Sequence, residues 1–364
     1  MSTSSGAGSP VTIGHTVDWD FAATVGAKLV RPTPPVTEYT KRQAIDQLAS
    51  SSRAAEGPVR DVTGLNEGAA ITDARIVDRA EWVRAATQSM RIMTGGEQGD
   101  AATLTKRAGG LTRRVTGAQT GAVLAFVSSG ILGQYDPFAP GDRGGGELLL
   151  VYPNVIAVER QLRVSPADFR LWVCLHEVTH RVQFRANPWL AEHMSASLAI
   201  VTDDNGQELT QVVGRLGEFV RARRAGEGQA AEPNSEGMVG FLRAMQSEPQ
   251  RKALDQLLVL GTLLEGHADH VMDAVGPKVV PSVATIRRRF NERRQRKQPP
   301  LQRVLRTLLG FDAKMNQYTR GKAFVDHVVD KVGMDAFNTV WTSPETLPLP
   351  TEVDEPQRWI ARVL

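Results

Sequence analysis

DFRLWVCLHEVTHRVQF, at residues 168–184, combines a largely apolar helical pattern with two histidines and a glutamate. Its start overlaps SPAD at 165–168, where serine can cap a helix, proline suits the first turn and aspartate favours the helix start. The helix is predicted to run to about Ala186 and to end before Asn187-Pro188. Its apolar flanks predict burial, and burying two histidines and a glutamate without a partner would be costly.

His176, Glu177 and His180 form the pattern H-E-x-x-H within this helix. Positions i and i+4 lie on one helix face about 6 Å apart, so two imidazoles can bind one ion there. Imidazole nitrogen suits Zn²⁺, which favours four ligands. Glu177, on the adjacent face, can then accept a proton from water that the metal has acidified. The alternative is a helix whose polar residues are hydrogen-bonded at its solvent edge.

A zinc centre of this kind needs a third protein ligand. The pattern H-E-x-x-H-x-x-G-x-x-H is excluded, because Gln183 replaces its glycine and Ala186 its third histidine. Two groups of candidates remain: Glu192 with His193 just downstream, and the sequence LEGHADH at 264–270.

The second group is the better candidate. Glu265 and Asp269 are at i and i+4 of a predicted helix, so Glu265 can ligate zinc while Asp269 hydrogen-bonds the far nitrogen of a ligand histidine. Gly266 suits close approach of two helices around the metal. His267 and His270 are candidates for stabilising an oxyanion or protonating a leaving group. The competing interpretations are solvent-facing histidines at a helix end and, for Glu265, a salt-bridged helix acid.

The rest of the chain predicts a mainly α (α+β) protein with a small sheet. The strand candidate is ELLLVYPNVIAVE at 147–159, where Pro153 must lie at an edge or bulge. The preceding residues 134–146, rich in Gly, Pro and Asp, are predicted to form a loop. Helical patterns cover about 37–56, 73–93, 117–133, 206–224, 236–260 and 253–274, and most of 300–364.

Composition is that of a globular protein, with 41% hydrophobic and 23% charged residues among 364. We expect a disordered terminus at 1–14 and one catalytic domain at 15–364, with a helical part at about 37–135 and a catalytic core at about 145–345. The single cysteine, Cys174, excludes an intrachain disulfide. With no secretory signal and no run long enough to span a membrane, a cytoplasmic location is expected.

Several segments together resemble a known group of enzymes. HEVTHRVQF at 176–184 and LLEGHADHVMD at 263–273 resemble the gluzincin pattern, a zincin subclass with glutamate as third ligand. More narrowly, the chain resembles actinobacterial-type zincin-like metalloproteases associated with deazaflavin coenzyme biosynthesis. The further matching segments are GILGQYDPF at 130–138, LLLVYPNVIAVE at 148–159, NPWL at 187–190 and KMNQYTRGKAFVDHVV at 314–329.

The resemblance implies a zincin-like fold and a zinc-dependent hydrolase holding one Zn²⁺ ion. His176, His180 and Glu265 would be the ligands and Glu177 the general base. One departure is that 84 residues, 181–264, separate the second histidine from the glutamate, more than in the best-known gluzincins. We expect the intervening residues to add helices around the cleft.

The substrate is expected to be a peptide or another amide. In zincins the strand before the active-site helix commonly lines the substrate cleft, and 147–159 is the candidate for that strand. Tyr318 is a candidate for a hydroxyl that polarises the oxyanion; the alternative is a tyrosine packed in the core.

The basic run RRRFNERRQRK at 287–297 has seven basic residues and one acid, within a net charge of +3. It has one aromatic residue and lacks a base-stacking pattern, so a solvated helix face is favoured over nucleic-acid binding.

The leading hypothesis for the function of the protein is a zinc metallopeptidase. The alternatives are a zinc-binding protein of the same fold with weak or no catalysis, acting as a partner or regulator, and a helical nucleic-acid or partner-binding protein with incidental histidines.

Overall fold

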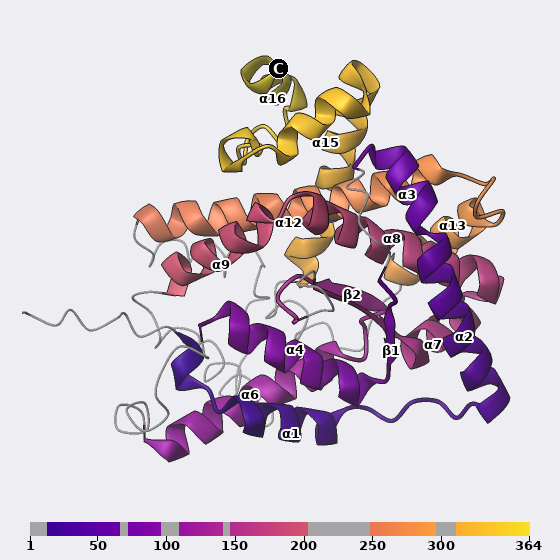
Figure 1. The fold of residues 1–364 in the computed structure, drawn as a ribbon, viewed down its shortest axis with the longest axis vertical. Helices are drawn as coiled ribbons and strands as arrows, with labels where there is room; N and C mark the ends of the chain where they lie inside the picture. The colour runs from indigo at the N-terminus through magenta and orange to yellow at the C-terminus, as the bar shows by residue number, and fades with distance from the viewer. Residues whose placement is uncertain (1–12, 66–71, 96–108, 141–145, 203–247, 296–310) are drawn as a thin grey trace, which may run out of the picture.

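The computed structural model describes residues 13–65, 72–95, 109–140, 146–202, 248–295 and 311–364 (Figure 1). These residues form a mainly helical structure around one three-stranded sheet. The helices are α1 (Trp19–Leu29), α2 (Glu38–Ala54), α3 (Glu56–Thr63), α4 (Arg79–Met93), α6 (Gly110–Val127), α7 (Tyr152–Leu162), α8 (Pro166–Ala186), α9 (Trp189–Thr202), α12 (Glu248–Val275), α13 (Val283–Gln295), α15 (Phe311–Phe337) and α16 (Pro356–Val363).

The sheet contains β1 (Arg75–Val77), β2 (Gly133–Asp136) and β3 (Glu147–Val151), in the order β1-β3-β2. The central strand β3 runs parallel to β1 and antiparallel to β2. Its side chains alternate between two apolar cores, with Leu148 and Leu150 on one side and Leu149 and Val151 on the other. This burial on both faces explains the continuous apolar sequence of the strand.

Helices cover both faces of this sheet. In Figure 1, α8, α9 and α12 lie on one side, and α1, α4 and α6 lie on the other. The larger apolar core forms around α8 and α12, whereas α4 and α6 contribute to the smaller one. Helix α8 is therefore held between the sheet and α12.

Helix α8 begins and ends where its sequence predicts. The hydroxyl of Ser165 accepts a hydrogen bond from the Asp168 N–H, and Pro166 occupies the first turn. The helix ends at Ala186. Thr37 caps α2, the helix predicted at about 37–56, in the same way, since its side chain accepts a hydrogen bond from the Thr40 N–H.

The strand prediction for 147–159 is wrong beyond Val151. Helix α7 starts at Tyr152, and Pro153 occupies its first turn, where a missing N–H costs nothing. As β3 is the central strand, it cannot pair with an extended substrate; the edge strand on the side of the candidate site is β2.

Three other boundaries differ from the sequence predictions. The segment 73–93 contains strand β1 before α4, because Asp78 caps that helix through a capping box with Glu81. The helix predicted at 117–133 starts earlier, at Gly110, and ends at Val127. Residues 133–136 form β2, although the sequence predicts a loop from residue 134 onward.

Some predictions fall outside the described residues: the terminus at 1–12, the helix at 206–224 and the first part, 236–247, of the helix at 236–260. Helix α12 ends at Val275, close to the predicted end at about 274 and directly before Gly276-Pro277, a pair that stops helices. Within the described part of the chain, no helix is both long enough and apolar enough to cross a membrane.

Candidate metal centre

Three side chains from α8 and α12 converge on one point. The Nε2 atoms of His176 and His180 lie 3.2 Å apart. The Oε2 atom of Glu265 lies 3.3 Å from Nε2 of His176 and 3.8 Å from Nε2 of His180. Ligand candidates with 84 residues between them in the chain therefore meet in space, as predicted. Among the described residues, no other group of His, Cys, Asp or Glu has this metal-binding geometry.

The remaining contacts of the two imidazoles direct their lone pairs to this point. Nδ1 of His180 lies 2.9 Å from the amide oxygen of Gln183, and Nδ1 of His176 lies 3.3 Å from the sulfur of Met272. Oxygen and thioether sulfur accept hydrogen bonds, so both Nδ1 atoms are the donors. In the neutral rings each Nε2 then carries a lone pair.

These lone pairs face a carboxylate oxygen that also lacks a donor. While both rings are neutral, the buried Oε2 of Glu265 accepts no hydrogen bond from any of the described residues. Three acceptors facing one another repel unless a cation lies among them. Ligands about 2.1 Å from a tetrahedral zinc ion are roughly 3.4 Å apart, close to the separations observed. The donor set and its spacing therefore fit Zn²⁺.

The pKa values of the metal-free protein reflect the same geometry. Burial lowers the pKa of His176, but the hydrogen bond and charge of Glu265 outweigh it and raise the pKa to about 9. Burial opposes ionisation of Glu265, yet hydrogen bonds from His176 and His180 hold its pKa well below the usual value. A proton shared within this group partly replaces a metal cation.

Glu177 lies next to these ligands on α8, where strand β2 passes unusually close. The side chain is 7% exposed and lines the adjoining cavity. A Cβ atom on Gly133 would lie 2.6 Å from Cγ of Glu177. Glycine at 133 therefore lets the edge strand approach the glutamate, a requirement that sequence reasoning missed.

The cavity beside the ligands has a volume of about 880 Å³. The metal-site residues and Glu177 form one part of its wall. Much of the remaining wall is apolar, contributed by α4, α6, β2 and α12, and includes Trp82, Met90, Leu124, Leu132 and Leu257. A substrate can therefore reach the candidate centre, with room for an apolar group beside it.

Asp269 does not make the predicted hydrogen bond to a ligand imidazole. Its carboxylate accepts a hydrogen bond from Arg287 at 2.9 Å. The imidazole of His180 instead has Gln183 as its partner. This role was not predicted from the sequence, in which Gln183 marks only a departure from glycine. Its spacing is the signal that could have found it, because i+3 from His180 lies on the same helix face.

Neither His267 nor His270 is one of the described residues that line the cavity. This position contradicts their predicted catalytic roles. His267 is completely buried, and burial, followed by the charges of His270 and His180, lowers its pKa to about 3. Nδ1 of His270 lies 2.7 Å from the carboxylate of Asp326 on α15. Both side chains therefore act in packing and hydrogen bonding between helices.

The other candidates also have defined positions. Glu192 and His193 lie on α9, outside the three-residue group; Glu192 is exposed and His193 packs against Trp189. Tyr318 lies in the first part of α15, outside the residues whose side chains the structure describes, so its predicted role remains a prediction.

The basic run lies largely on α13 and is not simply a solvated face. Arg287 binds Asp269 and Asp273 and lies over the ring of Trp172. Arg289 and Arg293 donate hydrogen bonds to residues of the α7 region. These three arginines therefore attach α13 to its neighbours.

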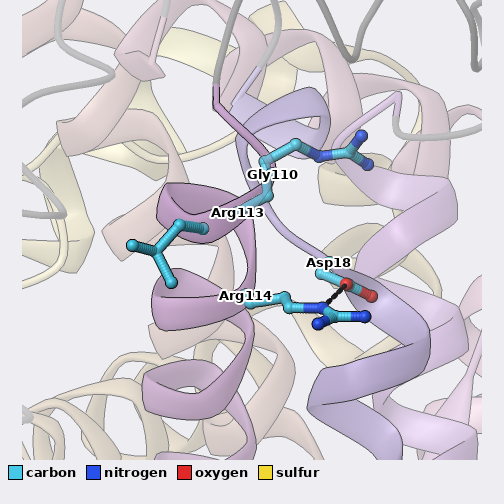
Figure 2. A pocket seen from close by; sticks show the side chains of 5 residues that line it. Asp18, Gly110, Arg113 and Arg114 are labelled. Carbon is cyan, nitrogen blue, oxygen red and sulfur yellow. Dashed lines mark ion pairs between the residues drawn. The ribbon is translucent and has the colours of Figure 1, made fainter.

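A second pocket, of about 440 Å³, lies where α6 begins. Figure 2 shows Arg114 facing Asp18 there, with 3.9 Å between Nε and a carboxylate oxygen. None of the three candidate ligands lines this pocket.

Comparison with known proteins agrees with this geometry. The profile of the family described as zincin-like metallopeptidase matches residues 17–360. This chain belongs to that family. Its profile covers nearly all of the chain, including α8 and α12 with the candidate ligands, and it supports a zinc-dependent hydrolase.

A solved structure from Chloroflexus aurantiacus is similar over most of its length. It is described as a "putative hydrolase with a novel fold", with 28% sequence identity and a TM-score of 0.65. The similarity covers 95% of the present chain and 98% of the other. The comparison with curated proteins gives no match.

Proposed function

We propose that this zincin-like protein is a zinc-dependent metallopeptidase that cleaves an amide bond. The observation that supports this most is that two imidazole nitrogens and a buried carboxylate oxygen converge on one point beside Glu177. The ligand set of His176, His180 and Glu265 is that of the gluzincin pattern. The finer link to deazaflavin coenzyme biosynthesis remains a prediction from the sequence resemblance.

The proposed chemistry is distributed among few residues. A bound zinc ion lowers the pKa of water and polarises a carbonyl group. Glu177 accepts a proton from the attacking water and passes it to the leaving nitrogen, so water and amide give an acid and an amine. Strand β2 borders the cavity where the scissile group would lie, and the apolar wall would receive a neighbouring side chain.

Glu177→Gln tests this proposal. We expect zinc to stay bound, because Glu177 is not a ligand, while hydrolysis falls by about 10²–10⁴-fold through loss of the general base. Zinc content is measured by mass spectrometry and activity with a mixture of unmodified peptides. Glu192→Gln, which changes an exposed acid on α9, is the control and should alter neither property.

Two outcomes would contradict the proposal. A full equivalent of zinc in His176→Ala or His180→Ala would refute the ligand assignment. Stoichiometric zinc with equal, negligible hydrolysis by the wild type and Glu177→Gln would favour the alternative of a zinc-binding partner or regulatory protein.

A further inference from the structure

Gln183 lies buried between the two helices that carry the candidate ligands. Its side chain belongs to α8 and is completely buried. Oε1 lies 2.9 Å from Nδ1 of His180. Nε2 lies 3.1 Å from the backbone oxygen of Leu264 and 2.9 Å from Nδ1 of His267, both on α12.

The contact with Leu264 determines which way the amide points. A backbone carbonyl can only accept, so the amide nitrogen must face α12 and the amide oxygen must face His180. His180 therefore donates from Nδ1, which leaves the lone pair on Nε2, the atom near His176 and Glu265.

His267 completes the hydrogen bonding of this amide. The second N–H of Gln183 points to Nδ1 of His267, so the proton of that neutral imidazole is on Nε2. This Nε2 has no hydrogen-bond partner in the described part of the chain, and the ring packs against the aromatic rings of Phe337 and Trp341. Exchange of the two amide atoms of Gln183 would place an oxygen against a carbonyl oxygen.

We propose that Gln183 is the positioning residue of the metal centre: it fixes the tautomer of His180 and ties that ligand to the backbone directly before Glu265. One amide thereby couples ligands from two distant segments of the chain. The inference rests on the proposed function, because it takes His180 and Glu265 as zinc ligands.

The wild-type protein provides the first test, without any variant. Nitrogen-15 NMR of the imidazoles should show His180 protonated on Nδ1 in the zinc-free protein and His267 protonated on Nε2 with or without zinc. A zinc-free His180 protonated on Nε2, or His267 protonated on Nδ1, would overturn the assignment.

The second test compares Gln183→Met with Thr179→Val. Methionine keeps the approximate volume but removes both hydrogen-bonding functions, so zinc affinity, measured by competition with a chelator, should fall about 10–100-fold. The NMR spectrum should also show a mixture of His180 tautomers. Thr179 is completely buried on α8, and its hydroxyl donates a hydrogen bond to the Leu175 backbone oxygen of the same helix, so Thr179→Val should leave both readouts unchanged.

His180→Ala separates the two hypotheses. If that variant loses zinc while Gln183→Met binds it with wild-type affinity, the positioning role is wrong and the metal site stands. If His180→Ala keeps its zinc, the proposed function itself fails. If Gln183→Met does not fold, the wild-type spectrum decides.

Discussion

We expect His176 to couple zinc binding to pH. Its pKa of about 9 in the metal-free protein means that this imidazole is protonated below pH 9, with the proton stabilised by Glu265. Zinc must displace that proton. The apparent affinity should therefore rise by about tenfold per pH unit up to about pH 9 and level off above it.

Titration calorimetry in buffers of different ionisation enthalpy measures this effect. At pH 7 it should show release of close to one proton per zinc bound. Glu265→Gln removes the charge that raises the pKa, so its proton release should be smaller. An affinity that did not change between pH 7 and pH 9 would contradict the assignment.

Buried charges also support the helix that bears the histidines. Arg170 donates to both carboxylate oxygens of Glu159, and Arg181 pairs with Glu56; all four side chains are almost fully buried. Each pair attaches α8 to another helix. Removing one partner would leave an uncompensated charge in the interior.

The approach of α12 to α15 requires glycine. A Cβ on Gly266 would lie 2.2 Å from the backbone carbon of Gly321, and one on Gly321 would lie 2.1 Å from the carbonyl oxygen of Thr262. Gly266 therefore does permit close helix packing, but the neighbour is α15, which carries none of the candidate ligands, and not a second helix of the metal site as expected. Because Gly266 follows Glu265, this contact also influences where the third candidate ligand lies.

Gly266→Ala should separate these helices and lower the free energy of unfolding by about 1–3 kcal/mol, with weaker zinc binding. Gly261→Ala, five residues earlier in α12, is the matched control. A Cβ there has no neighbour within 4 Å, so alanine should leave stability unchanged or raise it by up to about 1 kcal/mol. Denaturant unfolding followed by circular dichroism distinguishes the two; equal stabilities would refute the role of the contact.

On the scale of the whole molecule, zinc would join two segments that the chain itself connects only through residues 181–264. Because ligands bound to the native state stabilise it, free zinc at 1,000 times its Kd should add about 4 kcal/mol. Chelation should therefore lower the Tm measured by scanning calorimetry. His180→Ala should abolish the difference between zinc-loaded and chelated protein; a difference that persisted would place the stabilising metal elsewhere.

Local patterns account for much of the fold. The caps at Thr37 and Ser165 and the pair Gly276-Pro277 act within one helical turn, so α2, α8 and the end of α12 were predictable. The predicted strand at 147–159 was too long, because Pro153 suits a helix start as well as a strand edge. Neighbouring residues alone do not distinguish the two.

In the candidate site, too, some features follow from local sequence and others depend on tertiary packing. The spacing of His176 and His180 places both rings on one face of a helix wherever that helix lies, so local geometry sufficed for this pair. The partners of Glu265, Asp269 and His267 depend on how α8, α12, α13 and α15 pack. Contacts between segments far apart in the chain depend on the packed core as a whole, so the hydrogen bonds of Gln183 emerged only from the tertiary structure.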